Sequence, residues 1–221
     1  MISYYEHNLR ERGQAIIDRI LSGENCAIVS DAGMPCISDP GEDLVRLAAD
    51  AQIEVLVIPG PSAVISALCV SGLPTSRFSF EGFLSTNRKN RMDHLEQIKN
   101  DTHTLIFYEA PHKLLSTLQD MLDTLGNRRI SLARELTKIH EEVFRTTLSD
   151  AVIHYTDHTP KGEFVLVIEG AVEKKETSFT LEDAVALAKQ LSAGGLKPSD
   201  AAKEAASTTG FKKADIYKAM L

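Results

Sequence analysis

Apolar positions follow two alternating patterns over residues 1–75. Helical spacing, with apolar residues three or four positions apart, occurs in three segments, 9–22, 42–50 and 62–71. Between them, CAIVS (26–30) and IEVLVI (53–58) are short continuous apolar runs, which predict buried strands. This alternation is typical of a parallel sheet covered by helices on both faces. Ligands of such sheets bind beyond the carboxyl ends of the strands, where the turn-rich segments 31–41 and 59–62 lie.

The pattern changes around Gly72-Leu73-Pro74, after which strand-like segments are more frequent. Strands are predicted at 78–83, 102–109, 129–135 and 163–170, and a strand that runs into a helix at 141–155. Helical spacing is found at Met92, Leu95 and Ile98 and again over 114–125. These elements suit a second α/β domain.

The C-terminal part differs from both preceding regions. A polar and charged segment at 171–180 indicates a linker. Three short helical patterns follow, at 181–191, 198–207 and 212–220. They are compatible with a helix-turn-helix appendage and equally with a helical bundle that packs on the body. We therefore expect an N-terminal α/β domain (1–75), a second α/β domain (76–172) and a C-terminal helical extension (180–221).

Composition places the chain among globular proteins. Hydrophobic residues make up 43% of it and charged residues 25%. No apolar run approaches the ~20 residues that cross a bilayer, and the polar N-terminus is unlike a secretory signal. The three cysteines form no CxxC pair, which argues against a disulfide framework or a zinc site and fits a cytoplasmic protein; we expect Cys26 and Cys69 to be buried. The histidines lack metal-ligand spacing, so no metal is expected.

Charge limits the kind of nucleic-acid contact that the chain can make. A net charge of −7 argues against a general basic surface that coats nucleic acid. Local basic patches remain, at Arg88, Lys89 and Arg91 in a loop-like stretch and at lysines of the C-terminal helices. The alternative is that these are solvated surface charges.

The turn SDAGMPCISDPG (30–41) is the most informative stretch for chemistry. Gly33 permits a positive φ and a close approach of a ligand to the backbone, Pro35 stiffens the loop, and Asp31 can hold a cationic or hydroxyl group. The second turn, PGPSA (59–63), leads into a helix for which Ser62 is a plausible N-cap. Ordinary turn and cap residues are the alternative interpretation. The phosphate-binding and hydrolase fingerprints G-x-G-x-x-G, G-x-x-x-x-G-K-[ST] and G-x-S-x-G are absent.

Six motifs occur in one order over residues 1–170: SDAGMPCISDPG, PGPSA, RFSFEGFL, LIFYEAPHKL, ARELTKIHEE and KGEFVLVIEG. Together they resemble the ribosomal RNA small-subunit methyltransferase I family, a branch of the tetrapyrrole methylases. The resemblance implies a two-domain α/β fold of the tetrapyrrole-methylase type, with a cofactor cleft between the domains and a small C-terminal helical extension. Family members begin with a strand, a G-T-P-I-G-N-L-like loop and an A-E-D-T-R-like segment, whereas this chain starts near the family's H-N motif at His7-Asn8. We therefore expect its first domain to be incomplete at its start.

The same resemblance implies a reaction and a set of site residues. The reaction is S-adenosylmethionine-dependent 2′-O-methylation of a cytidine ribose in small-subunit ribosomal RNA, without a metal, by an enzyme that is a homodimer by analogy. The residues implied to line the cofactor cleft are Asp31, Ala32, Gly33, Pro35, Pro59, Gly60, Pro61, Ser62, Ala63, Tyr108, Ala133, Gly162, Glu163 and Phe164. Those implied in catalysis or substrate handling are Glu109, Arg134, Glu135 and Lys138. Those implied in RNA binding are Arg88, Lys89, Arg91, Lys212 and Lys213, and His7 and Asn8 are expected near the entrance.

Three alternatives stay open at this point. The polar residues of R-E-L-T-K can instead form an ion-pair network that joins the domains. A methyltransferase of the same fold can act on a tetrapyrrole or another small molecule. A chain with an incomplete first domain can also be an inactive binding module.

Overall fold

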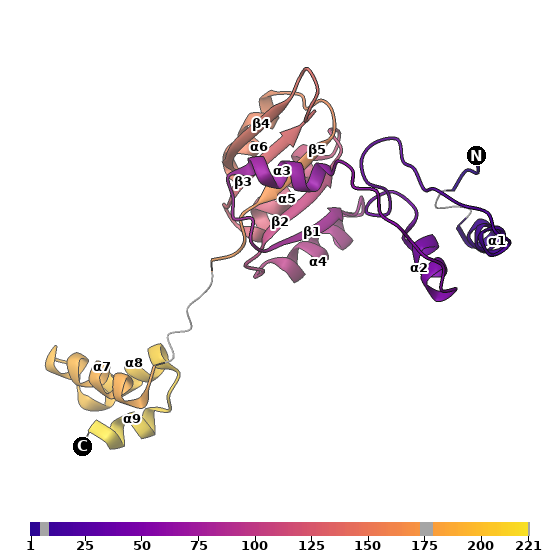
Figure 1. Ribbon diagram of the computed structural model, residues 1–221. Helices are drawn as coiled ribbons and strands as arrows, with labels where there is room; N and C mark the ends of the chain where they lie inside the picture. Colours follow the sequence, from indigo (N-terminus) through magenta and orange to yellow (C-terminus); the bar gives the residue numbers. More distant parts are fainter. Residues whose placement is uncertain (5–8, 173–178, 221) are drawn as a thin grey trace. The chain divides into compact units, whose positions relative to one another are not determined.

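The computed structural model describes residues 1–4, 9–172 and 179–220. Contacts group the chain into two units, Met1–Val172 and Glu173–Leu221. The helices of the first unit are α1 (Leu9–Leu21), α2 (Glu42–Asp50), α3 (Ala63–Ser71), α4 (Arg88–Ile98), α5 (Leu114–Leu125) and α6 (Leu148–Asp157). Its strands are β1 (Phe78–Phe83), β2 (Thr104–Glu109), β3 (Arg129–Arg134), β4 (Glu142–Thr147) and β5 (Phe164–Ile168) (Figure 1).

The five strands form one sheet in the order β1-β2-β5-β3-β4. β1 and β2 are parallel, and every other neighbouring pair is antiparallel. α4, α5 and α6 cover one face through a core that includes Leu95, Leu118 and Leu148. α3 covers the opposite face through a smaller core with Ala67 and Leu68, and it crosses in front of the sheet in Figure 1.

Burial on two faces explains why the central strands were recognisable in the sequence. Every residue of β5 is buried, and all of β2 is buried except the partly exposed Tyr108, so β5 and the middle of β2 are runs of apolar residues without alternation. α5 ends at Gly126, whose φ of +79° few other residues adopt, and whose N–H donates to the Leu122 carbonyl. The predictions of β1 to β5, α5 and the strand-to-helix passage from β4 to α6 are confirmed, as is the α/β class.

The two strands predicted in the N-terminal part are wrong for this structure. Residues 26–30 and 53–58 carry no strand pairing, and Val29 and Val55 to Ile58 are exposed. A strand needs ladder partners, and a two-stranded ribbon alone is marginal in water. α1 and α2 pack instead on each other through Ile16, Ile17 and Leu44. Ile28 and Ile53 are partly buried against the edge of this cluster.

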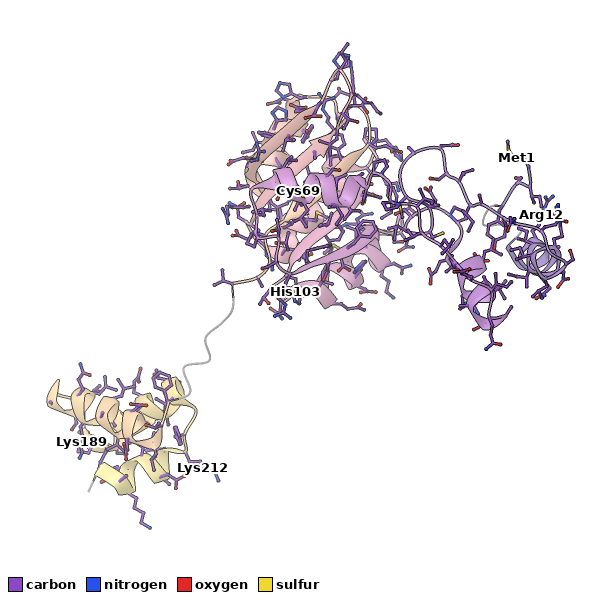
Figure 2. The ribbon with its side chains drawn as sticks, in the orientation of Figure 1. Met1, Arg12, Cys69, His103, Lys189 and Lys212 are labelled. Atoms are coloured by element: carbon purple, nitrogen blue, oxygen red, sulfur yellow. The ribbon has the colours of Figure 1, made fainter. Side chains whose placement is uncertain are left out.

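Two smaller expectations also need correction. The basic stretch 88–91 is the first turn of α4, capped by the Asn87 side chain, and not a loop before the helix. Cys26 and Cys69 are exposed rather than buried. Cys69 is on α3, whose other side packs on the sheet, as its label in Figure 2 shows.

The second unit contains α7 (Leu181–Ala193), α8 (Pro198–Thr209) and α9 (Lys213–Met220), which confirms three helices. They pack around small side chains, among them Ala184, Ala202 and Ile216. α7 begins with a reciprocal cap in which the Thr180 hydroxyl accepts the Asp183 N–H and the Asp183 carboxylate accepts the Thr180 N–H. The linker predicted at 171–180 falls mostly outside the described residues. Within the described ranges, none of the helices combines the length and the hydropathy that a bilayer crossing requires.

Candidate functional site

The two turns singled out in the sequence contact each other directly. The Met34 backbone N–H donates to the Pro61 carbonyl over 3.0 Å. Gly33 has a φ of +80°, and a Cβ added there would lie 3.1 Å from the Pro61 oxygen. At Gly60 an added Cβ would meet the Met34 sulfur at 3.2 Å. Glycine is therefore favoured at both positions, most clearly at Gly33, and the two turns that the resemblance implies line one cleft do converge.

The first turn is shaped by its own hydrogen bonds. The Ser30 hydroxyl donates to the Gly33 carbonyl over 3.1 Å and contacts that of Ala32 over 3.4 Å. The Asp31 and Asp39 side chains are exposed. A hollow of about 500 Å³ adjoins this turn; its lining includes Ser30, Asp31, Asp39, Pro40 and residues of α1 and α2. That volume is within the range of small-molecule sites.

The second turn, from Pro59 to Ser62, positions the beginning of α3. Ser62 is the N-cap, as predicted, and its hydroxyl accepts the Ile65 N–H at 3.5 Å. Ala63 is the first residue of the helix. The remaining N–H groups of this first turn have no helical partner, and they favour a negatively charged group nearby.

Tyr108, near the end of β2, connects the turns to the sheet. Burial, the largest cause, raises the pKa of Tyr108, and the negative charges of Asp39 and Glu163 act in the same direction. A hydrogen bond between the phenol and the Val64 backbone opposes them. The phenol is therefore neutral at physiological pH, and it lies where the first turn, the start of α3 and the segment before β5 approach one another.

The R-E-L-T-K turn follows β3 and is held in an uncommon conformation. Glu135 has a φ of +50° and Thr137 one of +66°. The Lys138 ammonium donates to Glu135 Oε1 over 3.1 Å, and the Thr137 N–H donates to Glu141 Oε2 over 2.6 Å. A Cβ added at Gly162 would lie 2.9 Å from Glu135 Oε1, which brings the segment before β5 against this turn. Positive φ at non-glycine residues is strained and is often associated with functional turns.

Side chains at the ends of β2, β3 and β5 divide between the two faces of the sheet. Tyr108 and Ala133 are on the α3 face. Phe164 is buried on the other face. On that face the Glu109 carboxylate accepts hydrogen bonds from the Thr117 hydroxyl over 2.6 Å and from the Ala110 backbone N–H over 2.8 Å. Arg134 forms an ion pair with Glu142. The structure thus brings Tyr108, Gly162, Glu163 and the R-E-L-T-K turn to one end of the sheet, but the Glu109 carboxylate is turned away from Tyr108.

The basic candidates of α4 differ in their surroundings. Arg91 is buried and donates two hydrogen bonds, of 2.8 and 2.7 Å, to the buried Asp120 carboxylate. Arg88 donates to the other Asp120 oxygen over 2.9 and 3.1 Å, but 68% of its side chain is exposed. Lys89 is exposed. Arg88 and Lys89 are accessible to a phosphate, whereas the Arg91 guanidinium is already occupied.

The remaining basic candidates lie at the start of α9. Lys213 is the first residue of α9 and its ammonium contacts the Ser199 hydroxyl at 2.9 Å, while the Lys212 carbonyl accepts N–H groups of the first turn of that helix (Figure 2). Both belong to the second unit. His7 and Asn8 lie outside the described residues.

Sequence reasoning missed two aromatic residues at this end of the sheet. The rings of Phe80 and Phe83 lie 5.0 and 5.4 Å from that of Tyr108, measured between centroids. A glycine inside a strand pattern, Gly82 in RFSFEGFL, was the available signal, because it often marks a bulge. The Asp120 partner of Arg91 had no comparable signal.

Comparisons with known proteins agree with this geometry. Residues 3–152 match the model of the tetrapyrrole (corrin/porphyrin) methylases. The chain is 46% identical to the ribosomal RNA small subunit methyltransferase I of Synechocystis sp., over all of this chain and 79% of the relative. It is also 46% identical to that of Halalkalibacterium halodurans, over 98% of this chain and 76% of the relative. Among solved structures, the methyltransferase CobJ superposes with a TM-score of 0.55 at 18% identity, over 73% of this chain and 71% of that one, a likeness of fold.

Proposed function

The chain belongs to the ribosomal RNA small subunit methyltransferase I family within the tetrapyrrole methylases, and from that premise we propose that it transfers a methyl group from S-adenosylmethionine to the 2′-hydroxyl of a cytidine ribose in small-subunit ribosomal RNA. The observation that carries the proposal is the direct contact of the two glycine- and proline-rich turns next to Tyr108. We place the enzyme in the cytoplasm, acting on the small ribosomal subunit. We expect a homodimer by analogy within the fold.

The residues present suit a donor that carries a sulfonium cation and a carboxylate. Gly33 and Gly60 expose bare backbone where the turns meet, so a flat or extended ligand can reach peptide groups. The exposed carboxylates of Asp31 and Asp39 complement a cation or ribose hydroxyls. The start of α3 complements a carboxylate. When bound, S-adenosylmethionine would supply an electrophilic methyl group, and the protein's task is to hold the acceptor hydroxyl in line with it.

The acceptor hydroxyl must lose its proton during the transfer. Glu135 is the candidate that we favour for this role, because its carboxylate is partly exposed at the R-E-L-T-K turn and its partner Lys138 can balance the charge. Tyr108 is neutral and can donate a hydrogen bond. Glu109 and Arg134 are held by Thr117 and Glu142, and we assign them the role of fixing the strand ends.

The proposal is tested with the full chain and two assays. Calorimetry measures binding of S-adenosylmethionine and S-adenosylhomocysteine, and methyl transfer from labelled donor is measured on small ribosomal subunits, with the product nucleotide mapped by mass spectrometry. We expect donor binding and a single 2′-O-methylated cytidine. Label that enters a tetrapyrrole but not the subunits would overturn the RNA assignment, and absence of donor binding would overturn the enzyme assignment.

Matched variants connect the result to the turns. Gly33→Ala and the control Gly210→Ala both place an alanine at a positive φ, of +80° and +78°, which costs about 1–2 kcal/mol in the left-handed helical region. Only the Gly33 variant adds a Cβ near Pro61, because the Gly210 position has no described neighbour within 4 Å. We expect donor affinity to fall for Gly33→Ala and to stay unchanged for Gly210→Ala.

A second pair tests the proton acceptor. Glu135→Gln should lower turnover by about 10²–10⁴-fold without weakening donor binding. Glu141→Gln changes a carboxylate of the same turn that accepts only the Thr137 N–H within the described contacts. Equal losses in the two variants would mean that the turn's shape, rather than the Glu135 carboxylate, limits the reaction.

A further inference from the structure

β1 places an aromatic side chain in an unusual position. Its six residues include Phe78, Phe80 and Phe83, and Phe83 remains 51% exposed although its ring contacts Tyr108. Phe80 packs on the same phenol at 5.0 Å with the rings at 68°, an edge-to-face contact. The three rings form a continuous surface, which we call the aromatic shelf (Phe80, Phe83 and Tyr108). Its outer part, the Phe83 ring, faces solvent.

A bulge in β1 creates the aromatic shelf. Phe80 pairs with Ile106 and Phe83 with Tyr108, while Gly82 pairs with Phe107, so Glu81 is an extra residue. In a regular strand, residues 80 and 83 would point to opposite faces. With one residue inserted, both point to the face of Ile106 and Tyr108. Bulges commonly re-aim a side chain beside a functional site.

Gly82 and Glu81 have separate roles in this bulge. Gly82 has a φ of +66°, and an added Cβ would meet no described atom within 4 Å, so the glycine serves backbone conformation rather than space. Glu81 is directed to the α4 side, where its carboxylate lies 2.9 Å from His94 Nε2. The bulge thus anchors one side chain to α4 and turns Phe83 the other way.

The aromatic shelf extends from Tyr108 on β2 to β1, the edge strand of the sheet. Tyr108 is near Asp39, Val64 and Glu163. α3 packs mainly on β3, β4 and β5. The outer end of the shelf is therefore on the β1 side of this face, where the chain continues through Leu84 into α4.

Positive charge follows directly after the shelf in the chain. Arg88 and Arg91 share the single Asp120 carboxylate, which leaves one positive charge in excess, and Lys89 adds a second. The first turn of α4 contains no acidic residue. Proteins bind single-stranded nucleic acid by stacking bases on exposed aromatic rings and by contacting the phosphates with cations. Here Arg88 and Lys89 follow Phe83 by five and six residues in the chain.

We infer that Phe83 stacks against a nucleobase of the RNA substrate and thereby presents its ribose to the site beside Tyr108, with Arg88 and Lys89 on the neighbouring phosphates. The inference rests on the proposed function and adds to it a residue that determines how the RNA is held. The adenine of the methyl donor is the competing flat ring, and donor affinity is therefore measured beside RNA binding in the test.

The test uses Phe83→Ala and the matched control Phe78→Ala. Phe78 is 39% exposed on the same strand, but it lies at the other end, opposite Thr104. A stacked base is worth about 1–3 kcal/mol, so Phe83→Ala should raise KM for small ribosomal subunits by roughly five- to hundredfold. S-adenosylhomocysteine affinity by calorimetry should remain within about twofold, and Phe78→Ala should leave both quantities unchanged.

A fluorescent variant keeps the inference testable apart from turnover. The chain contains no tryptophan, so Phe83→Trp and Phe78→Trp each introduce a single fluorophore. A short single-stranded RNA of mixed sequence should quench the emission of Phe83→Trp, and S-adenosylhomocysteine should not. For Phe78→Trp, RNA should leave the emission unchanged.

The outcomes separate this inference from the proposed function. An unchanged KM in Phe83→Ala, with an active wild type, overturns the stacking role alone. If Phe83→Ala weakens S-adenosylhomocysteine binding as much as it raises KM, the ring contacts the methyl donor, and the stacking role on RNA is overturned as well. If the wild type methylates no RNA, the proposed function fails, and quenching of Phe83→Trp by RNA would still support a base-binding ring.

Discussion

The buried pair between Arg91 and Asp120 offers the sharpest test of how α4 is held. Replacing Asp120 with Asn keeps the shape of the side chain and removes its charge. Only 4% of the Asp120 side chain and 8% of that of Arg91 are exposed, so water cannot compensate Arg91. The guanidinium would retain its bond to the Ser85 carbonyl, of 3.0 Å, but would lose its counter-charge.

The magnitude follows from this burial. Removing one partner of a buried ion pair costs about 3–5 kcal/mol, because the remaining charge is left uncompensated. For a domain of this size that loss corresponds to a melting temperature lower by about 6–20 °C. The matched control is Asp123→Asn on the same helix, whose exposed carboxylate accepts only from Gln119 among the described contacts and should cost under about 0.5 kcal/mol.

Urea denaturation followed by far-ultraviolet circular dichroism measures both variants, since the chain lacks tryptophan. The destabilisation of Asp120→Asn should be similar at low and high salt, because a buried pair is little screened. The double variant Arg91→Met with Asp120→Leu should be more stable than either single change. If Asp120→Asn unfolds at the same midpoint as Asp123→Asn, the reasoning from burial is refuted.

RNA binding provides the second half of this test. Lys89→Gln should reduce the slope of log affinity against log salt by about one, because one phosphate contact is lost. Arg91→Gln should reduce stability and leave that slope unchanged. A slope that changes equally in both variants would mean that Arg91 reaches the RNA, contrary to its position in the structure.

Three further predictions concern Tyr155 on α6, Thr117 on α5 and Gly162 before β5. Burial and then the charge of Glu142 raise the pKa of Tyr155 to about 12. The free energy of unfolding should therefore fall as pH rises from about 10 to 12, because the phenol ionises more readily in the unfolded chain. Tyr155→Phe should remove up to about 2–3 kcal/mol of that alkaline loss, as measured by urea denaturation. Thr117→Val removes a donor from the buried Glu109 and should cost about 1–3 kcal/mol by the same denaturation. Gly162→Ala, whose Cβ would crowd Glu135, should lower turnover in the methyl-transfer assay more than donor affinity by calorimetry; an equal fall in both would contradict the local effect.

Much of the second part of the first unit was predictable from sequence, for local reasons. β5 is apolar throughout and β2 from Leu105 to Tyr108, because both of their faces are covered, and α5 has an apolar stripe and a terminal glycine. The convergence of the turns at Gly33 and Pro61 followed from the family pattern. The signals for the strands and for α5 are each contained in a short stretch of chain.

The errors arise where a distant residue decides the outcome. Arg91 resembles any surface arginine until Asp120, 29 residues away on another helix, takes its charge. The exposed run from Val55 to Ile58 has the composition of a strand, but pairing depends on a neighbour that its own residues do not specify. The direction of Phe83 depends on the register of β1 against β2.

Strained backbone conformations occur in the turns that carry candidate site residues. Non-glycine residues with positive φ occur at Cys36, Gln52, Glu135 and Thr137 among the described positions, and three of these four are in the 30–41 turn or the R-E-L-T-K turn. Such conformations cost about 1–3 kcal/mol each and persist only where neighbours impose them. Glu141 binds the Thr137 N–H, and the missing Cβ of Gly162 makes room for the Glu135 carboxylate. The shape of the R-E-L-T-K turn is therefore imposed by residues outside its five positions, so the site includes those supports as well as its charged groups.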